Sequence, residues 1–324
     1  MARAQRFSDA PTSIDGDVTA MAVARPDHVG FPYRSVAEYV AGVLAFVHAA
    51  LHSGQPVLVA VPSAKLEILR DCLGSSGARV RFADMTVEGR NPGRILPGVL
   101  LAFADRHPGH RAAIVAEPVW PGRSELEYPA CVAHEALVNL AFAGRDAALL
   151  CPYDAAQLEP HVVHDAHRTH PFLQRRGGLR PSPAYADPRL TVADCNRPLP
   201  PVPAHAATMG FTTAAEVGEL LAFVAARTGA AGLKPHRQDL LTAATGELAA
   251  GTIRRTGRPA TVSVWTELDY IVCQLDDAGP RHDALAGVRT GGSGDGLLTA
   301  NLLCDLVRVY THPGGSSVRL QLTT

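Results

Sequence analysis

Short, continuous apolar runs alternate with amphipathic stretches through the first half of the chain. Such runs are typical of strands that are buried on both faces of a sheet. They lie at 56–61, 79–82, 112–115 and 147–151. The stretches between them place apolar residues at intervals of three and four, as amphipathic helices do. These lie at 35–52, 64–73, 92–106, 129–141 and 155–167. The alternation predicts a three-layer α/β fold, with a parallel sheet between two layers of helices.

The order of elements changes in the last third of the chain. Two helical patterns come first, and apolar strand patterns, a glycine-rich loop at 280–295, a third helix and two final strands follow. The helices are expected at 212–228, 235–255 and 297–306, and the strands at 260–266, 270–275, 308–311 and 317–322. This order differs from the alternation in the first half, and at 324 residues the chain is expected to form about two domains.

Two further segments separate or precede these domains. Residues 1–27 lack periodicity and are rich in small and polar residues, which predicts a disordered tail. Residues 173–208 carry many prolines, which favour an extended, semi-rigid linker. The expected domains are therefore 28–172 and 209–324.

Composition limits the classes of partner. The net charge of −1 provides no basic field for nucleic acid or an anionic membrane. No apolar run approaches the roughly 20 residues of a membrane-spanning helix. The six cysteines form no CxxC pair, and most lie in apolar runs, which indicates buried free thiols in a reducing compartment. These features predict a cytoplasmic protein with no direct nucleic-acid or membrane contact.

Candidate chemistry lies after the strand expected at 270–275. Asp277 stands two residues before Gly279, so a carboxylate could accept a hydrogen bond from a base amino group where the backbone comes close. The loop at 291–296 then opens a helix at Leu297, and free N–H groups at a helix N-terminus suit phosphate. Glycine loops before helices are common, so the order of the surrounding elements carries most of the signal.

In that order, residues 205–324 resemble the GHKL ATPase fold in its anti-sigma-factor serine-kinase branch. The resemblance is carried by Asp277-Ala278-Gly279, by the lid-like stretch 283–287, and by Gly296 with Asn301 one turn on. It implies an α/β sandwich of the GHKL ATPase type, with ATP or ADP as ligand and Mg²⁺ as its metal. It also implies protein partners, namely a sigma factor or an STAS-type anti-sigma antagonist, and a homodimer.

The resemblance assigns roles residue by residue. Glu247 matches the general base toward a serine hydroxyl. The positions that match cofactor-binding residues are Asp277 and Gly279 at the adenine, Gly294 and Gly296 at the lid and phosphates, Asn301, and Ser316 near the adenine. The purine end of the expected site is thus preserved.

The metal end departs from the family pattern. Gly251 occupies the position where the family has a magnesium-binding asparagine, and Asp295 adds a negative charge where phosphate would lie. Phosphoryl transfer depends on the metal, so weakened or absent kinase activity is expected. Whether the chain is an enzyme stays open at this point.

Separated motifs in the first half resemble the MEDS sensory domain of methanogen and methylotroph regulators. They are 54–59, 117–120, 134–139 and 151–154, and the resemblance spans about residues 28–172. It implies a sensory module for an unknown small molecule. The expected ligand-contacting residues are Glu117, Trp120, His134, Glu135 and Tyr153. The stretch 28–33 departs from the family pattern.

No metal site is predicted from sequence. His161, His164, His167 and His170 recur at intervals of three, so only neighbouring pairs share a helix face. No third ligand is evident near them, and a structural role is expected. His134-Glu135 is not HExxH because residue 138 is Val, and no P-loop motif follows any strand.

Together these patterns predict a cytoplasmic signalling regulator. A sensory domain controls an anti-sigma-factor-like GHKL module that binds its protein partner, with weakened or absent kinase activity. One alternative is an active ATP-dependent serine kinase of an STAS-type antagonist. Another is a small-molecule sensor whose C-terminal domain serves only as a dimerisation platform and binds no nucleotide.

Overall fold

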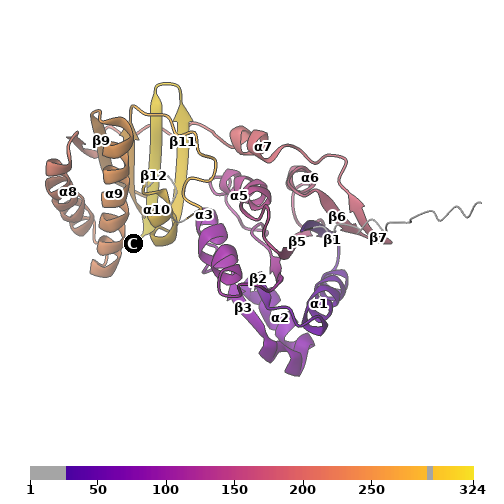
Figure 1. Cartoon of the computed structure of the whole chain (residues 1–324). Helices are drawn as coiled ribbons and strands as arrows, with labels where there is room; N and C mark the ends of the chain where they lie inside the picture. Colours follow the sequence, from indigo (N-terminus) through magenta and orange to yellow (C-terminus); the bar gives the residue numbers. More distant parts are fainter. Residues whose placement is uncertain (1–26, 290–294) are drawn as a thin grey trace, which may run out of the picture.

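The computed structural model describes residues 27–289 and 295–324, and it contains two β-sheets, each with its own helices (Figure 1). The tail predicted for 1–27 lies outside the described residues except for Asp27, and so does Gly294.

The first sheet has seven strands in the order β3-β2-β4-β5-β1-β6-β7. The strands are β1 (His28–Tyr33), β2 (Val57–Val61), β3 (Val80–Asp84), β4 (Ala112–Ala116), β5 (Ala147–Asp154), β6 (Phe172–Arg175) and β7 (Gly178–Pro181). All neighbours pair in parallel except β6 and β7, which form an antiparallel hairpin at one edge.

Helices cover both faces of this sheet. One face carries α1 (Val36–His52) and α2 (Ser63–Leu73), and a short 3₁₀ segment η1 (Gly74–Arg79) follows α2. The other face carries α3 (Pro92–Arg94), the π-helical segment η2 (Ile95–Leu101), α4 (Ala102–Ala104), α5 (Tyr128–Ala141) and α6 (Pro160–Thr169). Successive residues of a strand point to opposite faces. Accordingly, Val57 and Val59 of β2 join the core under α1, whereas Leu58 joins the core under α5.

The second sheet is antiparallel, in the order β11-β12-β10-β9-β8. Its strands are β8 (Ala207–Phe211), β9 (Ala260–Glu267), β10 (Tyr270–Asp277), β11 (Leu306–His312) and β12 (Gly315–Thr323). The helical elements of this domain are η3 (Ala214–Glu216), α8 (Val217–Ala230), α9 (Pro235–Thr256) and α10 (Leu297–Leu303), and the three α-helices share one core with the sheet. The predicted α/β fold class is confirmed: a largely parallel sheet and a second, antiparallel sheet, each packed with helices.

Several predicted elements differ from those observed. The helix expected at 155–167 begins only at Pro160, because proline at the first helical position has no N–H to donate. Strand β1 was not predicted, since its Gly30 and Pro32 are poor strand formers. The sheet tolerates Pro32 because β6 pairs only with Val29 and Gly30, so the proline lies beyond the end of that ladder.

The segment predicted as a linker, 173–208, is largely structured. It contains most of β6, all of β7 and helix α7 (Pro188–Asp194), which packs against α5 (Figure 1). Its proline-rich part lies over the face of the second sheet that is turned away from α9. There Arg319 donates to the carbonyl of Pro200 at 2.6 Å and lies over the ring of Trp265.

The two domains meet along the segment between β10 and α10. Val288 is buried in the core of the first domain and Leu285 packs against it, whereas Ala286 packs against the second core. Polar contacts accompany this packing. Asn91 donates to the carbonyl of Asn301 at 2.9 Å, and Arg289 donates to the carbonyl of Leu140 at 3.2 Å.

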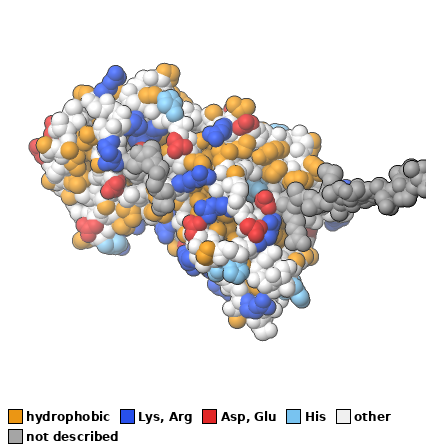
Figure 2. Space-filling view, viewed as in Figure 1, with side chains coloured by type: hydrophobic (Ala, Val, Ile, Leu, Met, Phe, Trp, Pro, Cys, Tyr) orange, Lys and Arg blue, Asp and Glu red, His pale blue; other side chains and the backbone are white. Residues whose placement is uncertain are grey.

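Among the described residues, no helix combines the length and the apolar composition needed to cross a membrane. On the face drawn in Figure 2, acidic, basic and apolar side chains are interspersed, as the near-zero net charge leads one to expect.

Gly93 lies at the closest approach of the two domains, and replacing it with alanine tests that contact. A Cβ at Gly93 would lie 2.3 Å from Oδ1 of Asn301, so the asparagine must leave its hydrogen bond to the carbonyl of Gly287. We expect Gly93→Ala to lower the free energy of unfolding by about 1–3 kcal/mol in urea titrations.

The matched control is Gly218→Ala, at an exposed position of α8 where a Cβ meets no atom within 4 Å. It should raise the free energy of unfolding by about 0.5–1 kcal/mol, because alanine favours helix over glycine. Equal effects of the two substitutions would contradict a close contact at Gly93.

Candidate functional site

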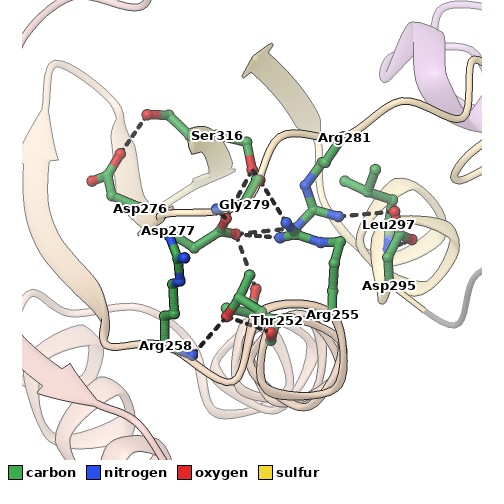
Figure 3. Close-up of polar contacts among 12 residues, drawn as sticks. Thr252, Arg255, Arg258, Asp276, Asp277, Gly279, Arg281, Asp295, Leu297 and Ser316 are labelled. Carbon is green, nitrogen blue, oxygen red and sulfur yellow. Dashed lines mark hydrogen bonds and ion pairs between the residues drawn. The ribbon is translucent and has the colours of Figure 1, made fainter. Parts of the chain in front are cut away.

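Asp277 is the centre of the site predicted in the second domain. It is the last residue of β10, and its side chain turns toward helix α9 (Figure 3). Its Oδ1 accepts hydrogen bonds from the backbone N–H of Gly279 at 2.9 Å and from the hydroxyl of Ser316 at 3.2 Å. The structure therefore brings Asp277, Gly279 and Ser316 together, as the sequence predicts.

The other oxygen of Asp277 is occupied by residues of α9 and of the following loop. Oδ2 accepts from the hydroxyl of Thr252 at 3.2 Å, forms an ion pair with Arg255, and lies 3.7 Å from Nη2 of Arg281. Arg255 also donates to the carbonyl of Gly279 at 2.5 Å. Both carboxylate oxygens are thus engaged inside the protein.

Arg281 links Asp277 to the loop before α10. Its side chain is 4% exposed, and its guanidinium pairs with Oδ2 of Asp295 at 2.8 Å. Burial lowers the pKa of Arg281, but arginine stays charged at any physiological pH. Two arginines and two aspartates therefore form one partly buried ion-pair network that joins the end of β10, helix α9 and the loop before α10 (Figure 3).

The loop before α10 packs directly on α9. A Cβ built on Gly251 would lie 2.5 Å from the carbonyl carbon of Asp295, and one on Gly296 would lie 2.4 Å from the carbonyl of Glu247. Gly296 also has φ of +79°, which favours glycine. Glu247, the predicted general base, is exposed on α9. The backbone of residues 295–296 occupies the surface of α9 where a metal and phosphates are expected from sequence.

Asn301 lies away from this cluster. Its side chain donates to the carbonyl of Gly287 at 3.2 Å, and its own carbonyl accepts from Asn91 of the first domain. It was predicted to bind a cofactor, but its observed contacts are at the domain interface.

The five residues predicted for the sensory ligand lie in four separate environments, because only Glu135 and Tyr153 are in contact. Glu117, at the end of β4, is fully buried and pairs with Lys65 of α2. Trp120 stacks with the guanidinium of Arg123, whose centre is 3.8 Å from a ring centroid. Glu135 and Tyr153 form a buried pair, with the tyrosine hydroxyl donating to Oε1 at 2.8 Å.

His134 lines a cavity of about 490 Å³ between the two domains. The cavity is bounded by α5, by α7 and the chain after it, and by residues 281–288. Neither ring nitrogen of His134 has a hydrogen-bond partner in the structure. Burial lowers the pKa of His134 to about 4, so the ring is neutral at physiological pH. Because both ring nitrogens are buried, the imidazole borders this mostly apolar cavity without presenting a nitrogen to it.

Several functional groups of the site were missed from sequence. Arg255 and Arg281 were not predicted as partners of Asp277, and Lys65 was not predicted as the partner of Glu117. The two arginines come from segments 26 residues apart, so no local spacing indicates their meeting. The signal available was the basic pair Arg254-Arg255, which begins three residues after the position where the family has a metal ligand.

Residues 27–171 match the model of the MEDS family, described as MEthanogen/methylotroph, DcmR Sensory domain. This confirms the resemblance predicted for residues 28–172 and indicates a role in signalling. No curated protein matches the chain.

The burial of Glu117 makes stability depend on pH. Burial raises the pKa of Glu117 to about 7 from 4.5, although the ammonium of Lys65 opposes the shift. Between these two values the folded protein holds a proton that the unfolded chain has released. The free energy of unfolding should therefore fall as pH rises from about 4.5 to 7, by on the order of 3 kcal/mol from this group.

Glu117→Gln removes the titrating group and keeps an acceptor for Lys65. Urea unfolding of both proteins from pH 4.5 to 8 should show the wild type losing stability relative to the variant as pH rises. A difference that does not change with pH would contradict the raised pKa of Glu117.

Proposed function

We propose that the chain is a signalling regulator in which the sensory domain controls a GHKL-type module, and that this module acts by binding a protein partner without transferring phosphate. The partner class is a sigma factor or an STAS-type anti-sigma antagonist, as the resemblance of residues 205–324 implies. The first part rests on the MEDS match, and the second on the geometry around Asp277.

The observation that carries the proposal is that both carboxylate oxygens of Asp277 are bound by other residues of the chain. A purine amino group needs a free carboxylate oxygen. In Asp277, Oδ1 accepts hydrogen bonds from Gly279 and Ser316, and Oδ2 accepts from Thr252 and pairs with Arg255. Separating one partner of a buried ion pair costs roughly 3–5 kcal/mol. That cost would weaken nucleotide affinity by about two to four orders of magnitude.

The metal end of the module supports the same conclusion. The backbone of Asp295 lies against Gly251, so an asparagine side chain at residue 251 would overlap it. The carboxylate of Asp295 further disfavours a phosphate group there. Since phosphoryl transfer relies on a positioned metal and positive charge, the arrangement favours a module that binds without catalysis.

Control by the sensory domain has a direct physical route. The lid segment is here residues 281–289. Its Leu285 and Val288 pack in the core of the sensory domain, and its Arg281 pairs with Asp277 and Asp295. The cavity that contains His134 is bounded by the same segment. A small molecule bound there would contact both domains, so its binding would alter how the lid segment is held.

Calorimetric titration with ATP, with and without Mg²⁺, tests the proposal. We expect the wild type to give no measurable heat at micromolar concentrations. The double variant Arg255→Ala/Arg281→Ala frees Asp277 and should gain ATP binding without phosphotransfer to an STAS-type antagonist. Arg258→Ala, at an exposed position in the turn after α9, is the matched control and should behave as the wild type does.

Partner binding is measured on the same proteins. A sigma factor or STAS-type antagonist from the source organism should bind the wild type equally well with and without ATP. Magnesium-dependent micromolar ATP binding by the wild type would contradict the proposal and favour an active kinase. Absence of binding to both partner classes would favour a dimerisation platform.

Val288→Ala tests the route of control. Loss of two buried methyl groups should weaken docking of the lid segment by roughly 1–3 kcal/mol. Hydrogen exchange at residues 283–289 should then accelerate at least several-fold. The control Val318→Ala lies in the second core and should leave the lid segment protected. Unchanged exchange at 283–289 in Val288→Ala would contradict the docking.

A further inference from the structure

We propose that His28, Glu135, Cys151 and His170 form a buried tetrahedral site for a divalent transition-metal ion, with zinc as the ion that fits best. The site lies in the sensory domain and does not depend on the proposed function of the C-terminal module. It also differs from the sequence prediction, in which no third ligand was evident beside the histidine run.

The donor atoms have the spacing of a metal shell. One ligand atom from each residue lies within 4.8 Å of the others. Oε2 of Glu135 is 3.3 Å from Nε2 of His28 and 3.5 Å from Nε2 of His170, and Sγ of Cys151 is 3.4 Å from Nε2 of His28. Tetrahedral zinc with bonds of about 2.0–2.3 Å separates its ligand atoms by roughly 3.3–3.7 Å. These three distances match that spacing, and the remaining donor pairs, which lie within 4.8 Å, would shorten by up to about 1 Å on metal binding.

Hydrogen bonds fix which nitrogen of each histidine faces the centre. The amide nitrogen of Asn139 donates one hydrogen to the carbonyl of Thr169 and shares the other between the carbonyls of Glu135 and Ala136. Its Oδ1 must therefore accept, and Nδ1 of His28 must donate to it at 3.1 Å. Nδ1 of His170 donates to the carbonyl of Ala166 at 2.7 Å. When each ring is neutral, both Nε2 atoms therefore point lone pairs inward, as ligating histidines do.

The carboxylate is oriented in the same way. Oε1 of Glu135 accepts from the hydroxyl of Tyr153, which leaves Oε2 directed at the two imidazoles. Oε2 of Glu135 and Nε2 of His170 are buried and have no hydrogen-bond partner in the structure. Lone pairs that converge without a proton donor between them repel one another, and a cation at their centre removes that repulsion.

Charge also balances at the proposed site. A divalent ion with one carboxylate, one thiolate and two neutral imidazoles has no net charge, so burial carries little electrostatic cost. The thiol of Cys151 loses its proton to solvent when the Sγ–metal bond forms. Two nitrogens, one oxygen and one sulfur in a tetrahedron are a donor set that suits zinc.

The fold brings these residues together from four elements. His28 and Cys151 lie on the adjacent strands β1 and β5, Glu135 lies on α5, and His170 follows α6. Gly30 leaves room for the ring of His170, because a Cβ there would lie 3.1 Å from its Cγ. Long stretches of chain separate the ligands, which is why no CxxC or HExxH spacing indicates the site.

Metal analysis of the full-length chain tests the proposal. After purification under reducing conditions, elemental analysis should find about one zinc ion per chain. Chelator-treated protein titrated with Co²⁺ should develop visible bands of tetrahedral cobalt and a thiolate-to-metal charge-transfer band. Cys151→Ser should lose the charge-transfer band, and Asn139→Ala should weaken Co²⁺ binding by about 10–100-fold.

Cys131→Ser is the matched control. Like Cys151, Cys131 is a buried free thiol, but it lies on α5 and outside the cluster. Its cobalt spectrum should equal that of the wild type. Zinc should raise the urea midpoint of the wild type and of Cys131→Ser more than that of Cys151→Ser. A folded wild type that takes up neither zinc nor cobalt would overturn the proposal, as would a charge-transfer band that survives in Cys151→Ser.

Discussion

The structure depends on the shared packing of the segment between β10 and α10. Val288 is buried in the core of the first domain, while Leu297, the first residue of α10, is buried in the core of the second. Neither Val288 nor Leu297 can be displaced without disturbing one of the two cores. Arg281, Asp295 and Asn301 belong to this region, so the ion-pair network, the loop over α9 and the interdomain cavity all depend on how it docks.

The same constraint explains why residue types that match a nucleotide site do not form an open one. Asp277, Gly279 and Ser316 lie together, but Arg255 and Arg281 neutralise the carboxylate from within. On the other side of this network, Gly251 allows the backbone of Asp295 to contact α9. The absence of a side chain at residue 251 is what permits that contact.

In the first domain, the parallel sheet determines which distant residues meet. It aligns β1 with β5 and so places His28 beside Cys151, while α5 and α6 bring Glu135 and His170 over the same face. Glu117, Trp120 and His134 diverge into other environments. These residues were expected to share one sensory pocket because they follow strands or lie on one helix. They face different surroundings, because neighbouring residues on a strand or helix point in different directions.

Sequence by itself determined the pattern of layers. Apolar periodicity locates α1, α5, α9 and the inner strands β2, β4 and β10, because burial on a helix or strand leaves a repeat of fixed period. It did not identify β1, whose Gly30 and Pro32 oppose strand formation, or the strands and helix between 173 and 208. Only tertiary structure decided that Arg255 reaches Asp277, that Leu285 and Val288 pack in the first domain, and that three distant side chains converge at Glu135. Such contacts join positions far apart in the chain, so a local sequence pattern cannot predict them.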